Sequence, residues 1–516
     1  MRRACLFVND GGMKESAKRG VVAGVVSVGA GLGAAEVVTV LLSLSTSPVL
    51  ALGESIIRIT PGDVAEAAIA AVGQLDKPLL VVGTVLGALV LGGVAGWLAV
   101  RSTAAGFALL VAMGGLGMAA TMATADSSAA DALPPVIAAL LSIALLGWLL
   151  SWARGTTARP ESAAVDRRQF LVRAGLVGLG AVALTGAGRL LAGGRQAIEA
   201  ARQTVALRLP KPVVPAGVSV PVPGVASWLT PNDEFYRIDT ALAIPRVLPE
   251  DWRLRIHGMV DRELELTYAD LVGRGLQQHW FTLCCVSNEV GGSLISNAQW
   301  SGVRIADVLA EAGVQPGADA VLSTSADGWN CGTPLEALTD DRAALFAVAM
   351  NGEPLPVEHG FPVRMVVPGL YGYVSATKWV VDLEVSRFAD FSAYWTQRGW
   401  SARGPVKTQS RIDVPRDGAG VSAGRVAVAG VAWAQHTGVD RVEVRIDDGP
   451  WQEAQLARVP NLDTWRQWTY AWDAEPGEHR IAVRATDDSG YTQTSERADV
   501  VPDGATGWHT IVVDVG

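Results

Sequence analysis

Four cysteines, Cys5, Cys284, Cys285 and Cys331, are the residues of this chain best suited to redox or metal chemistry. They are too few and too irregularly spaced for a disulfide framework or paired Cys-x-x-Cys zinc ligands, and the sequence has no Cys-x-x-Cys-His motif for covalent haem. Two of them are adjacent, and a cysteine thiolate is a soft ligand that suits a redox-active metal. The adjacent pair therefore indicates a metal ligand, with a buried structural pair or a vicinal disulfide as the alternative.

A second segment carries groups that bind phosphate. It contains His359, Arg364, a Pro-Gly turn, Gly372, Ser375 and Lys378. Phosphate binding requires a fixed cation, hydroxyl or backbone donors, and glycines that admit close approach of the backbone. Arg364, Ser375 and Lys378 are groups of these kinds. Taken singly, each of them also fits a buried strand, a turn or a surface lysine.

Together these segments resemble the sulfite oxidase family of molybdopterin-dependent oxidoreductases. Residues 283–288 match its Leu-x-Cys-x-Gly/Ser-Asn ligand loop, and the second segment matches the stretch in which a strand delivers an arginine and a Ser-x-x-Lys-Trp segment closes over the cofactor. The resemblance implies a molybdenum held by two dithiolene sulfurs of one pterin and one cysteine thiolate. With Asn288 in register, that ligand is Cys285. The implied cofactor-binding residues are Asn232, Phe235, Tyr236, Cys285, Ser287, Asn288, His359, Arg364, Gly372, Ser375 and Lys378.

A third segment, residues 232–240, resembles the family's aromatic-Arg-Asn-His motif but departs from it. Arg237 is retained and is a catalytic candidate with Cys285, whereas Asp239 stands in place of the histidine. Glu289 stands where sulfite-oxidising members have an arginine. Because an anion such as sulfite needs several fixed positive charges, these changes should weaken anion binding by an amount on the order of kilocalories per mole. The candidate substrate-pocket residues are Asp239, Glu289, Trp329 and Thr333. For the last two, a turn with a packed tryptophan is the alternative.

A membrane part precedes these segments. Four apolar stretches, at residues 20–44, 78–99, 104–123 and 134–153, have the length of about 20 residues that a helix needs to cross a bilayer. The flanking lysines and arginines place the N-terminus and residue 160 in the cytoplasm. All six histidines follow residue 250, so these helices cannot hold a bis-histidine haem, and we expect a membrane anchor. A proton or quinone role for Glu36, inside the first stretch, is the alternative.

An arginine pair follows the fourth stretch. Residues 166–173 and the apolar run at 176–192 resemble a twin-arginine export signal, with a cytoplasmic helix end as the alternative. Such a signal implies that the chain after about residue 195 is exported already folded, as a protein needs when its cofactor is inserted inside and used outside. We therefore expect a multi-pass protein of the cytoplasmic membrane with an extracytoplasmic catalytic domain. Translation starts at Met1 or Met13, and the positive flank after Met13 favours the latter.

The fold class we predict is multi-domain. Its parts are a four-helix transmembrane anchor (1–155), the twin-arginine-like segment with a fifth apolar helix (156–194), a Pro-rich linker (195–230), an α+β molybdopterin domain of the sulfite oxidase type (231–403) and a C-terminal immunoglobulin-like β-sandwich of the dimerisation type (404–516). In the α+β domain, runs at 252–259, 363–367 and 378–385 are strand-like, and runs at 305–312 and 334–338 are helix-like. In the last domain, residues 425–433, 439–446, 465–472 and 479–485 alternate with period two.

The predicted function is two-electron oxygen-atom transfer on a small-molecule substrate, sulfite or another sulfur compound, by a molybdenum-molybdopterin cofactor. An S- or N-oxide reductase acting on, for example, methionine sulfoxide is the alternative in the same class, and a non-catalytic surface adhesion or receptor protein is the alternative in a different class. Since the sequence has no haem or iron-sulfur motif, a separate cytochrome, quinone or membrane haem protein must exchange electrons. The family's C-terminal domain also allows a homodimer. The net charge of −9, with no basic run, argues against nucleic acid.

Overall fold

The chain is described here from a computed structural model, which covers all residues except 1–9, 43, 45, 62–63, 65–74, 125–126, 155–171, 173–174, 178–193, 206–208, 210 and 243. It forms two compact units. One comprises Met1–Ala197 and Ala241–Arg246, and the other comprises Ile198–Thr240 and Val247–Gly516.

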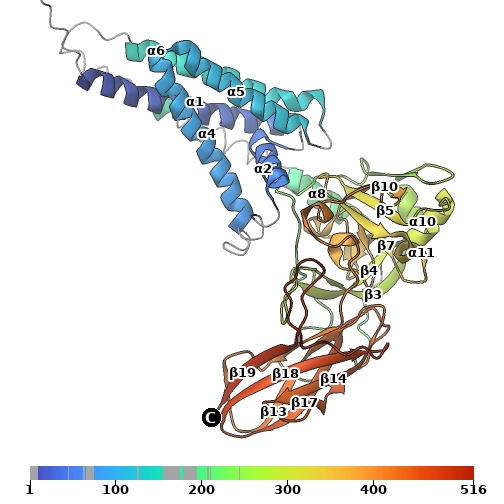
Figure 1. Cartoon of the computed structure of the whole chain (residues 1–516). Coiled ribbons are helices and arrows are strands. Elements are labelled where there is room, and N and C mark those ends of the chain that lie inside the picture. Colours follow the sequence, from blue (N-terminus) through green and yellow to red (C-terminus); the bar gives the residue numbers. More distant parts are fainter. Residues whose placement is uncertain are drawn as a thin grey trace, which may run out of the picture. The chain divides into compact units, whose positions relative to one another are not determined.

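The first unit is helical (Figure 1). Its elements are α1 (Asp10–Leu41), α2 (Pro48–Ile59), α4 (Asp76–Arg101), α5 (Thr103–Met122), the 3-10 helix η2 (Ala129–Ala132) and α6 (Leu133–Arg154). Four segments are long and apolar enough to cross a membrane: Ser16–Leu41, Asp76–Arg101, Thr103–Met122 and Ala129–Ser151. The four predicted apolar helices are therefore confirmed, with ends that differ by a few residues.

Glycines let α1 and α4 approach each other closely. A Cβ atom at Gly24 would overlap the carbonyl of Gly92, and one at Gly96 would overlap the carbonyl of Gly20. Small residues of this kind allow direct backbone packing where lipid removes the hydrophobic drive for helix association. Glu36 lies on α1 and is partly buried, and its role stays a prediction.

The second unit begins within helix α8 (Gly194–Thr204), at Ile198. The predicted Pro-rich linker therefore begins with a helix, and its extended part starts only after Thr204. Arg202 fixes the end of α8 by donating to the carbonyls of Pro354 and Leu355 at 3.1 and 2.9 Å. The twin-arginine-like segment and the fifth apolar helix, predicted at residues 156–194, lie largely outside the described residues.

Two sheets form the α+β domain. One has the strand order β2-β1-β10-β5-β6, and the other has the order β3-β4-β7-β8 with β9 paired to β7. The strands of the first are β1 (Arg253–Gly258), β2 (Leu264–Thr267), β5 (Ala320–Ser325), β6 (Asn330–Pro334) and β10 (Val380–Ser386). Those of the second are β3 (Gln277–Cys284), β4 (Ile295–Arg304), β7 (Leu345–Met350), β8 (Glu353–Pro354) and β9 (Arg364–Val366). The helices are α9 (Tyr268–Gly273), α10 (Ile305–Ala312) and α11 (Leu335–Thr339), and the 3-10 turns are η3 (Val357–His359), η4 (Gly372–Val374) and η5 (Thr396–Arg398).

The second sheet is the buried centre of this domain. All six residues of β7 are buried, and so is every residue of β4 except its last, Arg304. A strand covered on both faces has no need to alternate apolar and polar residues. The period-two pattern therefore did not predict β4 or β7.

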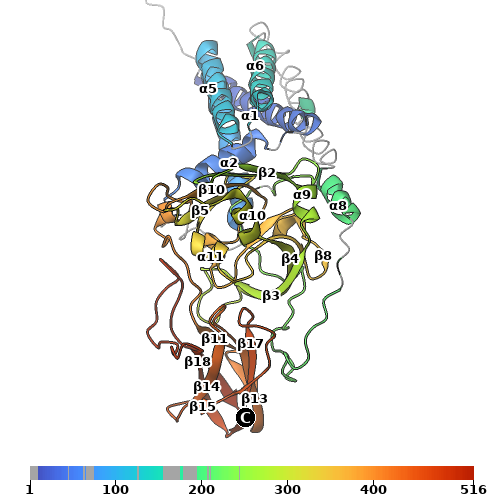
Figure 2. The ribbon, with the colours of Figure 1, turned by 90° about the vertical axis from the view of Figure 1, so that its right-hand side faces the viewer.

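The C-terminal domain consists of two sheets that share one apolar core (Figure 2). One sheet has the order β11-β13-β17-β16, and the other has the order β12-β19-β18-β14-β15. The strands are β11 (Gln409–Val414), β12 (Ala419–Val421), β13 (Gly424–Trp433), β14 (Val439–Ile446), β15 (Gln452–Glu453), β16 (Gln455–Leu456), β17 (Arg466–Ala474), β18 (Gly477–Asp487) and β19 (His509–Val515). Val428, Trp468, Val483 and Ile511 lie in the core between them. The apolar helices, the α+β domain and this β-sandwich confirm the predicted fold class.

Candidate functional site

The predicted ligand loop lies between β3 and β4. The Cys285 N–H donates to the Leu294 carbonyl at 2.9 Å, and the Leu294 N–H donates to the side-chain oxygen of Asn288 at 2.8 Å, so Asn288 closes the loop. The side-chain nitrogen of Asn288 is buried and has no hydrogen-bond partner among the described residues. A buried donor left without an acceptor indicates that a ligand belongs beside it.

Cys285 is buried and its thiol is free. Cys284 is also free, so the described structure contains no vicinal disulfide at this pair. Burial raises the pKa of Cys285, and hydrogen bonds from the Ser287 N–H and hydroxyl act in the opposite direction because they stabilise the thiolate. This environment suits a cysteine whose thiolate charge is balanced by a metal cation.

Arg364, at the start of β9, is a buried cation. Its guanidinium donates to the carbonyl of His359 at 3.1 Å and to those of Met365 and Ala376 at 3.4 Å. Within the described part of the chain, no carboxylate forms an ion pair with it. Burial lowers the pKa of Arg364 to about 10. The guanidinium also lies over the Trp300 ring, 5.2 Å from its centroid. A buried guanidinium held by carbonyls and a ring is prepared to bind an anion.

Lys378 and Arg237 share one carboxylate. Asp239 Oδ2 accepts from Lys378 Nζ and from Arg237 Nε, both at 2.8 Å. Burial lowers the pKa of Lys378 to about 8, while Asp239 acts in the opposite direction; Arg364 and Arg237 lower it further. We call Arg237, Arg364 and Lys378 the cation cluster.

Aromatic rings line the same region. Phe235 stacks on Tyr236 with ring centroids 5.4 Å apart, and it meets His359 and Trp300 edge-on at 5.5 and 5.6 Å. Burial first, and then the nearby cations, lower the pKa of His359 to about 3, so its imidazole is neutral at pH 7. Burial raises the pKa of Tyr236, and the charge of Cys285 acts in the same direction. Tyr236 therefore lies within electrostatic range of the ligand loop.

Gly372 lies where the cation segment meets the other two segments of the site. A Cβ atom at this position would lie 3.8 Å from the Tyr236 hydroxyl oxygen and 3.9 Å from the Cys284 carbonyl oxygen. The three segments singled out in the sequence, at 232–240, 283–288 and 359–378, thus converge in the folded chain.

Two predicted cofactor ligands use their side chains inside the protein. Asn232 donates to the Met350 carbonyl at 3.3 Å and accepts from the Asn351 side chain at 2.8 Å. Ser375 is buried and donates to the Tyr371 carbonyl at 2.9 Å. Both side chains shape the neighbouring backbone, and their contact with a cofactor stays a prediction.

The four pocket candidates have different surroundings. Asp239 lies within the cation cluster, and Glu289 is exposed. Trp329 is partly buried in the turn whose Ala326 N–H donates to the Trp379 carbonyl, next to Lys378. Thr333 is fully buried and donates to the Val374 carbonyl at 2.7 Å. It therefore lies in the core, and its assignment to the pocket stays a prediction.

The C-terminal domain supports the ligand loop through residues that sequence patterns did not predict. Arg411, paired with Asp413, donates to the Gly292 carbonyl at 2.7 Å. A Cβ atom at Gly291 would overlap the ring of His509. Arg411 lies 119 positions from the loop it binds, so no short-range motif could have indicated this contact.

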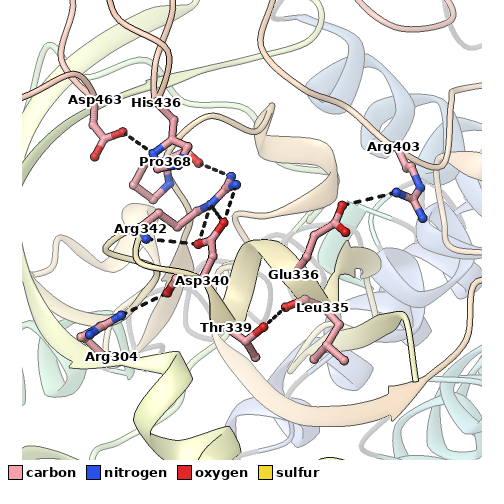
Figure 3. Close-up of polar contacts among 10 residues, drawn as sticks. All are labelled: Arg304, Leu335, Glu336, Thr339, Asp340, Arg342, Pro368, Arg403, His436 and Asp463. Carbon is pink, nitrogen blue, oxygen red and sulfur yellow. Dashed lines mark hydrogen bonds and ion pairs between the residues drawn. The ribbon is translucent and has the colours of Figure 1, made fainter. Parts of the chain in front are cut away.

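A second support holds the Pro-Gly turn that follows β9 (Figure 3). Arg342 binds both carboxylate oxygens of Asp340 at 2.8–2.9 Å and donates to the Pro368 carbonyl at 3.1 Å. His436 of the C-terminal domain lies against the same turn, and its ring is 3.3 Å from the Asp463 carboxylate. The C-terminal domain therefore contacts both the ligand loop and the turn beside the cation cluster.

Comparison with known proteins agrees with this site. The family described as "Oxidoreductase molybdopterin binding domain" matches residues 241–395. The mitochondrial sulfite oxidase of Mus musculus is 32% identical over 324 residues, which cover 53% of this chain and 58% of that protein. The oxidoreductase YuiH of Bacillus subtilis is 34% identical over 153 residues, which cover 30% of this chain and 74% of that protein. The chain belongs to the sulfite oxidase family of molybdopterin oxidoreductases.

This member of the sulfite oxidase family also shares its fold with a solved structure, over more of the chain than residues 241–395. The sulfane dehydrogenase SoxCD of Paracoccus pantotrophus superimposes with a TM-score of 0.50 and 23% identity, covering 60% of this chain and 90% of that one. Because the chain spans only 58% of the mouse sulfite oxidase, the substrate and partners of this sulfite oxidase family member do not follow from those of the relatives.

Proposed function

We propose that this chain is a membrane-anchored, extracytoplasmic molybdopterin-dependent oxidoreductase that transfers one oxygen atom in a two-electron step on sulfite or another sulfur compound. The observation that carries the proposal is the convergence of the Cys285 loop with a buried cation cluster. Family membership sets aside the alternative of a non-catalytic adhesion protein.

The residues present fit the implied cofactor. Three cations and the Asp239 carboxylate leave two positive charges in the cluster, since His359 is neutral. A phosphate monoester carries about −1.5 to −2 at neutral pH, so the cluster matches the terminal phosphate of a molybdopterin in charge. The side-chain nitrogen of Asn288, which has no partner among the described residues, offers a further donor in the loop that carries Cys285.

Each group then has a definite task. Cys285 would hold the molybdenum through its thiolate, and Arg364 and Lys378 would hold the pterin phosphate. When bound, the molybdenum-molybdopterin cofactor supplies the oxygen-atom transfer and the two-electron redox change. Arg237 orients an anionic group at the mouth of the cluster, where 44% of its side chain is exposed. The buried ring of Phe235 excludes water behind it.

A reductase for S- or N-oxides is the second candidate. The Arg237 guanidinium already forms an ion pair with Asp239, and the exposed side chain of Glu289 adds a negative charge in the ligand loop. Both features disfavour a dianion such as sulfite relative to a neutral oxide. Oxidation of the substrate passes electrons singly to a separate carrier such as a cytochrome, a quinone or a membrane haem protein, and reduction draws them singly from such a carrier.

A substrate panel distinguishes these reactions. The purified full-length protein, loaded with cofactor, is assayed with sulfite and an artificial electron acceptor, and with methionine sulfoxide and an artificial donor. Turnover of sulfite supports the first candidate, and turnover of the sulfoxide alone supports the second. A molybdenum-loaded protein that turns over neither a sulfur compound nor an N-oxide contradicts both. Protease treatment of intact cells and of spheroplasts tests the extracytoplasmic location, because an exported domain is cleaved without lysis.

A further inference from the structure

Trp379, which directly follows Lys378, has a backbone conformation that its side chain disfavours. Its φ is 50°, in the left-handed region, where a bulky residue is an outlier. Such strain persists only where the surrounding structure holds it, and it is concentrated at functional sites. The contacts of Trp379 therefore indicate what the strained turn does.

Two hydrogen bonds fix this tryptophan. Its ring nitrogen Nε1 donates to the Val357 carbonyl of η3 at 3.0 Å, and its own carbonyl accepts from the Ala326 N–H at 2.9 Å. The residue is only 1% exposed. Contacts on both sides therefore hold the backbone in the left-handed conformation and the ring in one position.

The ring lies against the ammonium of Lys378. Lys378 Nζ is 4.8 Å from the ring centroid, within the range of about 6 Å in which a cation is attracted to an aromatic face. The ammonium also donates to Asp239 Oδ2 at 2.8 Å and to the Glu358 carbonyl at 3.2 Å. The adjacent carbonyls of Val357 and Glu358 thus accept from Trp379 and Lys378, respectively. The turn at Trp379 therefore determines where the ammonium lies.

We propose that Trp379 is a positioning residue of the site: its left-handed backbone and anchored ring hold the Lys378 ammonium within the cation cluster, where the cluster binds an anion. The inference rests on the proposed function, which assigns an anion to this cluster. Without the ring, the ammonium loses one of its neighbours, and the strained turn can relax and release the flexible lysine side chain to water. The cluster then loses one of the cations that face the anion.

The pH dependence of anion binding reports the position of Lys378. The charged and titratable groups that face its ammonium are Asp239, Arg237, Arg364 and His359. Burial lowers the pKa of Lys378 to about 8, so the affinity for an anion should decline between pH 7 and 9. The pKa values of His359 and Arg364, lowered to about 3 and to about 10, lie outside this range. A Lys378 released to water regains a pKa near the usual 10.5, and the decline should then disappear.

Sulfate titrations of the cofactor-free full-length protein in detergent test this inference, by calorimetry at constant ionic strength between pH 7 and 9. Trp379→Leu removes the ring. It should lower the sulfate affinity at pH 7 about tenfold, as expected for one lost charge-assisted contact, and should flatten the decline. Trp379→Phe keeps a ring face and should keep the decline. Circular dichroism checks that each variant is folded.

Trp465→Leu is the matched control, because Trp465 is also almost fully buried and its Nε1 donates to a backbone carbonyl, that of Trp228, at 3.0 Å. It should keep the affinity and the decline of the wild type. A Trp379→Leu variant that keeps both would overturn the inference, as would an equal loss in Trp465→Leu or a wild type that binds no sulfate. A flat profile in Trp379→Phe would also overturn it, even if Trp379→Leu does not fold.

The molybdenum content of the purified wild type separates the two proposals. A protein that takes up no molybdenum, yet shows the decline in the wild type and loses it in Trp379→Leu, would refute the proposed function and leave the role of Trp379 standing. A loaded protein whose Trp379→Leu variant keeps the affinity and the decline would refute that role alone.

Discussion

Arg364 provides the sharpest test of the phosphate site. Replacing it with methionine removes the guanidinium but keeps a long apolar side chain in the same buried space. Burial lowers the pKa of Arg364 from 12.5 to about 10, which corresponds to roughly 3 kcal/mol held against the charged form in the cofactor-free protein. Its hydrogen bonds oppose this, but two of the three are 3.4 Å long and contribute little.

Because the hydrogen bonds offset only part of this penalty, the guanidinium does not stabilise the cofactor-free protein. We expect Arg364→Met to change the free energy of unfolding there by less than about 2 kcal/mol, whereas breaking a buried ion pair costs about 3–5 kcal/mol. The loaded protein loses a charge-assisted contact to phosphate worth about 2–3 kcal/mol. The stabilisation that the cofactor confers should therefore shrink by at least that amount.

Denaturant unfolding of the full-length protein in detergent, followed by tryptophan fluorescence with and without cofactor, measures both quantities. Pterin content after purification gives an independent readout. Arg466→Met is the matched control: Arg466 also donates to two carbonyls, of Ala457 and Val439, but in the C-terminal sandwich. The control should leave pterin content unchanged. A severe loss of stability in cofactor-free Arg364→Met, together with full pterin content, would refute the assignment of Arg364 to the phosphate.

Three further predictions follow from single contacts. Gly291→Ala should displace the ligand loop and lower both stability and molybdenum content, because its Cβ atom would overlap the His509 ring; metal analysis and thermal unfolding check this. Gly24→Leu should disrupt the helical unit in detergent, while Gly115→Leu, with open space around it, should be tolerated; size-exclusion chromatography and thermal unfolding compare them. The pKa of Lys378 is lowered to about 8, so the affinity of the cofactor-free protein for sulfate should fall as pH rises from 7 to 9, and Lys378→Met should remove this dependence.

The lowered pKa of Lys378 also makes the free energy of unfolding depend on pH. Its pKa in the folded protein lies below the usual 10.5, so the unfolded chain binds more protons between about pH 8 and 10.5. The contribution of Lys378 to the free energy of unfolding should therefore rise with pH across this window.

Sequence patterns predicted the elements whose exposure alternates. Helix α10 and strand β14 have the predicted bounds, because each buries one face and exposes the other. The long apolar helices were equally clear from their length. Strand β7 was missed because both of its faces are buried and its residues show no period.

The sequence predicted the residues of the site but not the contacts between them. Motifs placed Cys285 and Arg364 in separate segments, and the fold brings these segments together around Tyr236 and Gly372. The pairing of Asp239 with Lys378 spans 139 positions, and short-range patterns carry no information about such contacts. The sequence did show that Asp239 replaces a histidine, which marked the position without revealing its partners.

The central claim is that Cys285 holds molybdenum at a pterin site formed by these segments. Metal analysis of the purified full-length protein tests it most directly, with Cys284→Ser as the matched control for Cys285→Ser. We expect one molybdenum per chain in the wild type and in Cys284→Ser, and loss of the metal in Cys285→Ser with the fold retained. A wild-type protein without molybdenum, or a Cys285→Ser variant that keeps its full content, would contradict it.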